Sequence, residues 1–119
     1  IRNFKLKMDF EFIYKICTKA EWLKAKKEGK FLGSKKDIED GFIHFSNKDQ
    51  LKGTLSKYFL NQKDLVLLKV EALKLNNLIY EQASDGNMFP HLYAHLDISH
   101  VYNDYEININ EEGNHILPI

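Results

Sequence analysis

The chain is poor in several residues on which many protein classes depend. Among its 119 residues there is one cysteine, Cys17, so no disulfide can form within the chain. A domain of this length buries well over half of the surface of its unfolded chain and needs no such cross-link. A lone cysteine suits a reducing compartment and is most simply a small buried apolar side chain. These features predict one globular domain over residues 1–119, located in the cytoplasm.

Long apolar runs and targeting signals are also missing. No stretch approaches the ~18 apolar residues that a membrane helix needs, and no basic segment followed by an apolar one marks a signal peptide. We therefore expect no membrane association. Residues 1–8 are a loose arm, a first strand or a vector-derived remnant, and Met8 is an alternative start.

Positive charge is missing from the last third of the chain. Residues 1–74 contain all 17 Lys and Arg with 10 acids, whereas residues 75–119 contain 7 acids and no Lys or Arg. The simplest interpretation is mutual attraction between two parts of one domain. The basic cluster consists of lysines 24, 26, 27, 30, 35 and 36. Because lysine favours the surface in any fold, this cluster is most simply a solvated helix face, and we expect no nucleic-acid binding.

Local patterns at the start predict a strand and a helix. Residues 12–18, FIYKICT, are rich in β-branched and aromatic side chains, which is typical of a strand. Thr18 is followed three residues later by Glu21, the spacing of a capping box. A helix over residues 19–28 should follow, with Trp22 and Ala25 facing inward.

The next segment predicts a loop, a short strand and a second helix. Residues 30–40 are polar and suggest a loop or short turn that leads into GFIHFS at 41–46. Ser46 is placed to cap the second helix, and Gly53 inside it costs about 1 kcal/mol relative to alanine, which suggests close packing against a neighbour or has no particular cause. The apolar face of this helix should consist of Leu51, Leu55, Tyr58 and Phe59.

The second half contains strands without a clear helix. Residues 64–70 form a continuous apolar run, as in a strand buried on both faces. The remaining segments are a strand at 76–82, a turn at 83–87, a proline-broken segment at 88–96 and a last strand at 100–109. Strands outnumber helices in this pattern, which predicts an α+β protein with two main helices in the first half, not a doubly wound sheet.

His44 is the first residue with chemical potential. In an extended segment, Phe42, His44 and Ser46 share one face. A buried imidazole needs partners for its ring nitrogens, and Asp40 is a carboxylate within reach. From the residues alone, His44 is either a satisfied core histidine or part of a site.

A second group of polar residues lies in YEQASDGNMFPHLY, residues 80–93. Pro90 forces the residue before it into an extended conformation, so His91 and Tyr93 should share a face. Together with Glu81 they make either a polar pocket or a network that holds a loop in place.

Metal binding is not expected. His91, His95 and His100 invite a zinc interpretation, but Pro90 breaks the helical spacing that such ligands would need. There is no second cysteine and no HExxH motif.

Taken in order, these blocks resemble the DUF952 family, which consists of small, mostly bacterial proteins of unknown function. The matching stretches are IYKI, AEW, GKFLGSKKDIEDGFIHFS, TLSKYF, DLVLLKVE and YEQASDGNMFPHLY, over about residues 13–96. The resemblance implies an architecture like that of ADP-ribosyltransferases, with small mixed or antiparallel sheets around a cleft in which those enzymes bind NAD. A related branch, the RNA 2′-phosphotransferases, relies on several arginines. This chain has only Arg2, which counts against that branch.

The resemblance also implies roles. His44 would hold a ribose hydroxyl, Glu81 would stabilise an oxocarbenium ion with Glu106 as the competitor, and Tyr93 or Phe42 would stack on a ring. The candidate ligand-binding residues are Ser34, Asp40, Phe42, Ser46, His91 and Tyr93, and the catalytic candidates are Glu81 and His44.

Two classes of function stay open, since fold likeness does not transmit activity. One is a non-catalytic domain that binds a small molecule or nucleotide. The other is an NAD-dependent ADP-ribosyl transferase or NAD glycohydrolase, with NAD as a possible cofactor. The sequence leaves the ligand and the oligomeric state open.

Overall fold

The structure is a computed structural model that describes residues 11–119. The predictions for residues 1–8 and for Arg2 lie outside these residues. The helices and strands, in chain order, are β1 (Phe12–Thr18), α2 (Lys19–Glu28), β2 (Lys30–Phe31), α3 (Lys35–Asp40), β3 (Ile43–His44), α4 (Leu51–Tyr58), β4 (Leu65–Glu71), β5 (Leu78–Gln82), β6 (Met88–Leu92), β7 (Leu96–Asp97), β8 (Val101–Ile109) and β9 (His115–Ile116).

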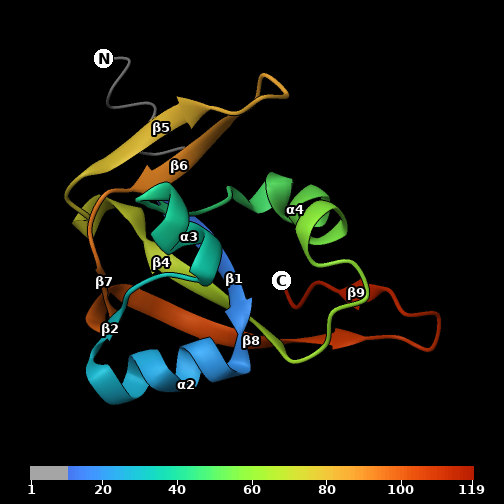
Figure 1. Cartoon of the computed structure of the whole chain (residues 1–119). Helices are drawn as coiled ribbons and strands as arrows, with labels where there is room; N and C mark the ends of the chain where they lie inside the picture. The colour runs from blue at the N-terminus through green and yellow to red at the C-terminus, as the bar shows by residue number, and fades with distance from the viewer. Residues whose placement is uncertain (1–10) are drawn as a thin grey trace.

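The strands form three antiparallel sheets. Their orders are β1-β4-β8-β9, β2-β7 and β3-β6-β5. Helices α2 and α4 lie on opposite sides of β1 and β4, and the β5–β6 hairpin lies at one end of the molecule, away from β9 (Figure 1). The α+β prediction is therefore confirmed, with antiparallel sheets and three α-helices in the described part of the chain.

The core forms on both faces of the four-stranded sheet. On one face Val66 and Leu68 of β4 pack with Trp22 of α2, and on the other Leu65 and Leu67 pack with α4. The prediction that this strand is buried on both faces is confirmed. Fully burying a leucine contributes roughly 1.5–3 kcal/mol, so β4 is a major source of stability.

The first strand and helix of the described residues fold as their local signals predict. Strand β1 and helix α2 have the expected bounds, and the capping box of Thr18 and Glu21 is present. The helix ends at Gly29 with φ of 83°, in the left-handed region that glycine tolerates best. Trp22 and Ala25 are its buried residues.

The prediction of a loop or short turn over residues 30–40 is wrong. This stretch contains β2 and a six-residue helix, α3, whose N-cap is Ser34. A second capping box is present, because Ser34 accepts from the backbone N–H of Asp37 while the Asp37 carboxylate accepts from the backbone N–H of Ser34. The helix was overlooked because its residues are almost all charged and show no apolar periodicity.

The prediction that Ser46 caps the second helix is also wrong. Asn47, not Ser46, precedes the 3-10 turn Lys48–Gln50 that leads into α4. Ser46 instead forms a β-bridge with Tyr14 of β1, which buries it. A Cβ added at Gly53 would meet nothing within 4 Å, so the expected close packing is not found. On the predicted apolar face, Leu51 and Leu55 are buried but Tyr58 is 55% exposed.

The first five residues of the proline-broken segment form β6, the central strand of its sheet. Proline has no N–H to donate and usually weakens such a position. Here Phe45, just past the end of the short β3, donates its N–H to the Pro90 carbonyl at 2.9 Å. In an antiparallel sheet the N–H and C=O of one residue point to the same neighbouring strand. The missing N–H of Pro90 would therefore face the residue just past the end of β3, and its loss removes no hydrogen bond from the centre of the sheet. The strand expected at 100–109 is present as β8, but β9 follows it.

Cys17 should be chemically inert in the folded protein. It is 1% exposed, and burial, with a smaller effect from Glu21, raises the pKa of its thiol to about 12. Because the thiolate is the nucleophile, iodoacetamide at pH 8 should alkylate the native protein about a thousandfold more slowly than the urea-unfolded protein. Equal rates in the two states would contradict this, and mass spectrometry over time measures both.

Within residues 11–119, no helix is long and apolar enough to cross a membrane.

Candidate functional site

Strands β3, β5 and β6 bring the two predicted polar groups together. His44 lies opposite His91 in the antiparallel pairing of β3 with β6. The centroids of the two rings are 5.3 Å apart, with the rings nearly edge to face. Their neighbours Ile43 and Leu92 point the other way and are buried. We call the side chains on the opposite, more exposed side the histidine face: Phe42, His44, Glu81, His91 and Tyr93.

Phe42 holds the rings of the histidine face together. Its ring stacks on His91 with centroids 4.1 Å apart and an interplanar angle of 27°. It also contacts the rings of His44 at 4.5 Å and Tyr93 at 5.1 Å. One face of Phe42 is thus covered by His91, whereas Tyr93, 41% exposed, is the ring most accessible to a flat ligand.

Glu81 fixes the positions of His91 and Tyr93 on the histidine face. Its Oε1 accepts from the Tyr93 hydroxyl at 2.6 Å and lies 2.7 Å from His91 Nδ1. The hydrogen bonds from Tyr93 and then His91 hold the pKa of Glu81 below its usual range, so the group is ionised near neutral pH. Because a carboxylate only accepts, Nδ1 of His91 donates, and in the neutral ring Nε2 is then a hydrogen-bond acceptor.

His44 is held by two carboxylates. Its Nδ1 lies 2.6 Å from Asp37 Oδ1, and its Nε2 lies 3.0 Å from Asp40 Oδ2. Both ring nitrogens can donate to carboxylates only in the imidazolium form. The side chain is 31% exposed. The expectation that His44 is partly buried and hydrogen-bonded is therefore confirmed.

Asp37 is the residue that sequence reasoning missed. It is 2% exposed, and Lys15 of β1, itself buried, lies 2.8 Å from its Oδ2. Its Oδ1 also accepts from the backbone N–H of His44 at 3.1 Å. Burial opposes ionisation, but the hydrogen bond from His44 and the charge of Lys15 outweigh it and hold the pKa of Asp37 well below its usual range.

The backbone around α3 is shaped to place Asp37. Gly33 has φ of 110°, and a Cβ there would lie 2.7 Å from the Cβ of Asp37. Glycine is therefore needed both for the conformation and for the close approach. The spacing of Ser34 and Asp37, a serine followed three residues later by an acid, was the available signal for this helix.

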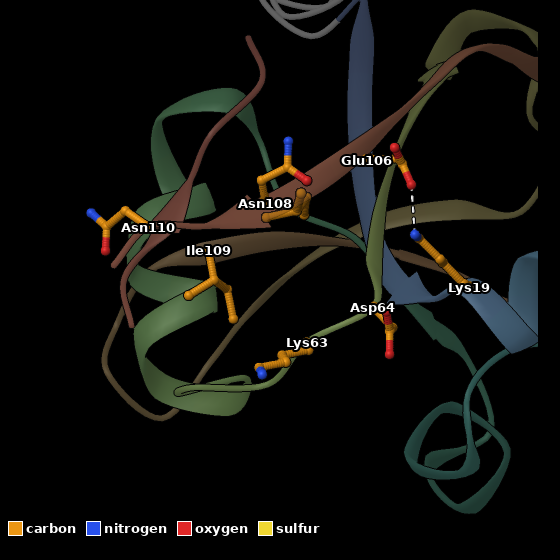
Figure 2. A pocket seen from close by; sticks show the side chains of 8 residues that line it. Lys19, Lys63, Asp64, Glu106, Asn108, Ile109 and Asn110 are labelled. Atoms are coloured by element: carbon orange, nitrogen blue, oxygen red, sulfur yellow. Dashed lines mark ion pairs between the residues drawn. The ribbon is translucent and has the colours of Figure 1, made fainter. Parts of the chain in front are cut away.

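The other candidates lie elsewhere. Ser34 caps α3, and the hydroxyl of Ser46 lies 2.9 Å from that of Thr54 on α4. Glu106 is on β8, in a different sheet, where it forms an ion pair with Lys19. Both residues line an open hollow of about 310 Å³, and Figure 2 shows the ion pair among the side chains of that hollow. The hollow is lined by Lys19, Lys63, Asp64, Glu106, Ile107, Asn108, Ile109 and Asn110.

Residues 11–119 contain no group of three or more His, Cys, Asp and Glu side chains arranged to hold a metal ion. His95, which is exposed, lies between β6 and β7, and His100 lies in the 3-10 turn before β8. The expected absence of a metal stays a prediction.

Comparison with known proteins places the chain in a family. The model of the family described as "Protein of unknown function (DUF952)" matches residues 16–104. The chain belongs to the DUF952 family. The match begins just after Lys15 and includes the whole histidine face and α3 with Asp37.

Solved structures of a similar protein agree with this fold. The crystal structure of protein CC0527 from Caulobacter crescentus is 42% identical, with a TM-score of 0.84 over 88% of this chain and 93% of that chain. A double mutant of CC0527 gives a TM-score of 0.83. The solution NMR structure of CC0527 gives 0.78 at 43% identity, over 87% of this chain and 90% of that one. No curated protein matches the chain.

Proposed function

We propose that this DUF952 protein binds a small ligand at the histidine face, and that the ligand carries a ribosyl or nucleotide group. The pairing of His44 with His91, with each ring oriented by its own carboxylate, carries the proposal. A network that served only to hold the hairpin would not require two oriented imidazoles beside a partly exposed tyrosine.

The chemistry of the face suits such a ligand. Tyr93 supplies an accessible ring for stacking, and Glu81 supplies an ionised carboxylate that can accept from a ribose hydroxyl. Lys36, which lies 3.3 Å from Asp40 Oδ2, is a cation at the margin of the face and suits a phosphate. An ADP-ribosyltransferase-like architecture, implied by the family resemblance, is part of this proposal.

Titration calorimetry with ADP-ribose, AMP and NAD tests the proposal. Wild-type protein should bind at least one of them, and a ligand at 100 times its dissociation constant should add about 2.7 kcal/mol to the free energy of unfolding. Replacing His44 with alanine should weaken binding by about 10- to 100-fold, because a hydrogen bond to a charged group is worth about 1.5–3 kcal/mol.

His95→Ala is the matched control, since His95 is exposed and outside the histidine face. It should leave affinity unchanged. Wild-type protein that binds none of the three compounds at millimolar concentration would reject the proposal, and so would equal weakening by the two variants.

A second candidate is NAD glycohydrolysis or ADP-ribosyl transfer, favoured by the ionised Glu81 beside an oriented histidine. In this reaction the bond between nicotinamide and ribose breaks and nicotinamide leaves with the bonding electron pair. Water or an acceptor then forms a bond to the ribosyl carbon and loses a proton to solvent. A carboxylate at Glu81 would stabilise the positive charge that develops on the ribose.

A further inference from the structure

The two carboxylates that hold His44 are not equivalent. Asp37 is buried and is bonded by His44, Lys15 and the N–H of Ser34. Asp40 is 34% exposed at its side chain and reaches His44 through one contact, from Nε2 to Oδ2 at 3.0 Å. Moving Asp37 would break several hydrogen bonds and leave the buried ammonium of Lys15 without its counterion. Moving Asp40 away from His44 breaks one surface contact.

Asp40 also has a second place to go. It is the last residue of α3, immediately before Gly41, whose φ is 86°. The same Oδ2 that contacts His44 lies 3.3 Å from Lys36 Nζ, one turn earlier in the helix. Asp40 can therefore release His44 and keep a partner.

We propose that Asp40 is a displaceable occupant of the ligand position at His44 Nε2, and that Asp37 is the positioning residue that keeps the ring in place when Asp40 leaves. This rests on the proposed function, in which His44 contacts the ligand. The incoming group is an oxygen acceptor, such as a hydroxyl or phosphate oxygen, because it replaces a carboxylate oxygen on the same donor. Asp40 thus competes with the ligand and lowers the affinity of the empty site.

Removing Asp40 should therefore strengthen binding, whereas most changes at a binding site weaken it. Exposed ion pairs are worth about 0.2–1 kcal/mol, so Asp40→Ala should raise affinity for an oxygen acceptor up to about fivefold. Inorganic phosphate is the probe, because it needs no ribose recognition. Long-range ¹H–¹⁵N spectra of the histidine rings report its arrival at His44 Nε2.

Three comparisons make the result specific. Glu39→Gln removes a neighbouring exposed charge on α3 and should leave phosphate affinity unchanged. The gain from Asp40→Ala should disappear in a His44→Ala background. In ligand-free protein, Asp40→Ala should shift the Nε2 resonance of His44 and leave Nδ1, held by Asp37, nearly unchanged.

The outcomes separate this inference from the proposed function. If Asp40→Ala lowers phosphate affinity, or if phosphate at tens of millimolar never reaches Nε2 in that variant, the displacement proposal is wrong. A similar gain from Glu39→Gln would also overturn it, by assigning the effect to general charge. If phosphate behaves as expected but ADP-ribose binds no better than phosphate, the proposed ligand class fails and the role of Asp40 stands.

Discussion

Asp37→Asn should lower the free energy of unfolding by about 3–5 kcal/mol, the usual cost of leaving one member of a buried ion pair without its partner. Lys15 is 6% exposed, and its ammonium has Asp37 Oδ2 and the His44 carbonyl as partners. With a neutral amide at 37, the charge of Lys15 remains buried without a counterion. A fall in melting temperature on the order of 10–20 °C should follow.

Urea unfolding followed by circular dichroism measures this effect. Asp49→Asn is a matched control at an exposed position and should change stability by less than about 0.5 kcal/mol. In a double-mutant cycle with Lys15→Met, the two losses should not add, because the second substitution removes the charge that the first left unpaired. Fully additive losses would show that the pair is not coupled.

The ionised Asp37 should make the free energy of unfolding fall as the pH is lowered. The pKa of Asp37 is depressed in the folded protein, so its contribution is present above its unfolded value of about 3.9 and is lost as the pH falls further. The stability gap between wild type and Asp37→Asn should therefore be widest near neutral pH and narrow below about pH 4. A gap of constant size between pH 7 and pH 3 would contradict the assignment.

Glu81→Gln should lower turnover of NAD by about 100-fold or more if the wild-type protein releases nicotinamide from NAD. The carboxylate interacts more strongly with the oxocarbenium-like transition state than with the ground state, so its loss affects turnover more than binding. The magnitude is that of removing one electrostatic group at a reacting centre. Glutamine keeps the shape and can still accept from Tyr93.

Glu106→Gln is the matched control, because Glu106 lies on β8 and pairs with Lys19. Nicotinamide release, NAD affinity and melting temperature should be measured on wild type, Glu81→Gln and Glu106→Gln. Loss of turnover in Glu106→Gln alone would move the reacting centre to the hollow of Figure 2. Wild-type protein without turnover would leave Glu81 as a binding residue and reject the enzymatic candidate.

Elements with strong local signals were predictable from the sequence. Helix α2 has a capping box at one end and a glycine at the other, and these interactions involve residues three or four apart. Strand β4 is an apolar run from Leu65 to Leu68 and again at Val70, and these five residues are buried on the two faces of the sheet. The DGFIHFS and FPHLY blocks also singled out His44 and His91, which the structure pairs.

The sequence by itself therefore determined the α+β class and the bounds of β1 and α2, and it singled out His44 and His91 as the residues to test. Only the tertiary structure decided that His44 and His91 are neighbours, because their pairing joins residues 47 apart through the register of β3 and β6. It also decided the role of Asp37. In the sequence Asp37 is one acid among several in a polar stretch, and its importance arises because β1 brings the buried cation of Lys15 against it. Contacts of this kind depend on how distant segments pack, and no local pattern of residue types encodes them.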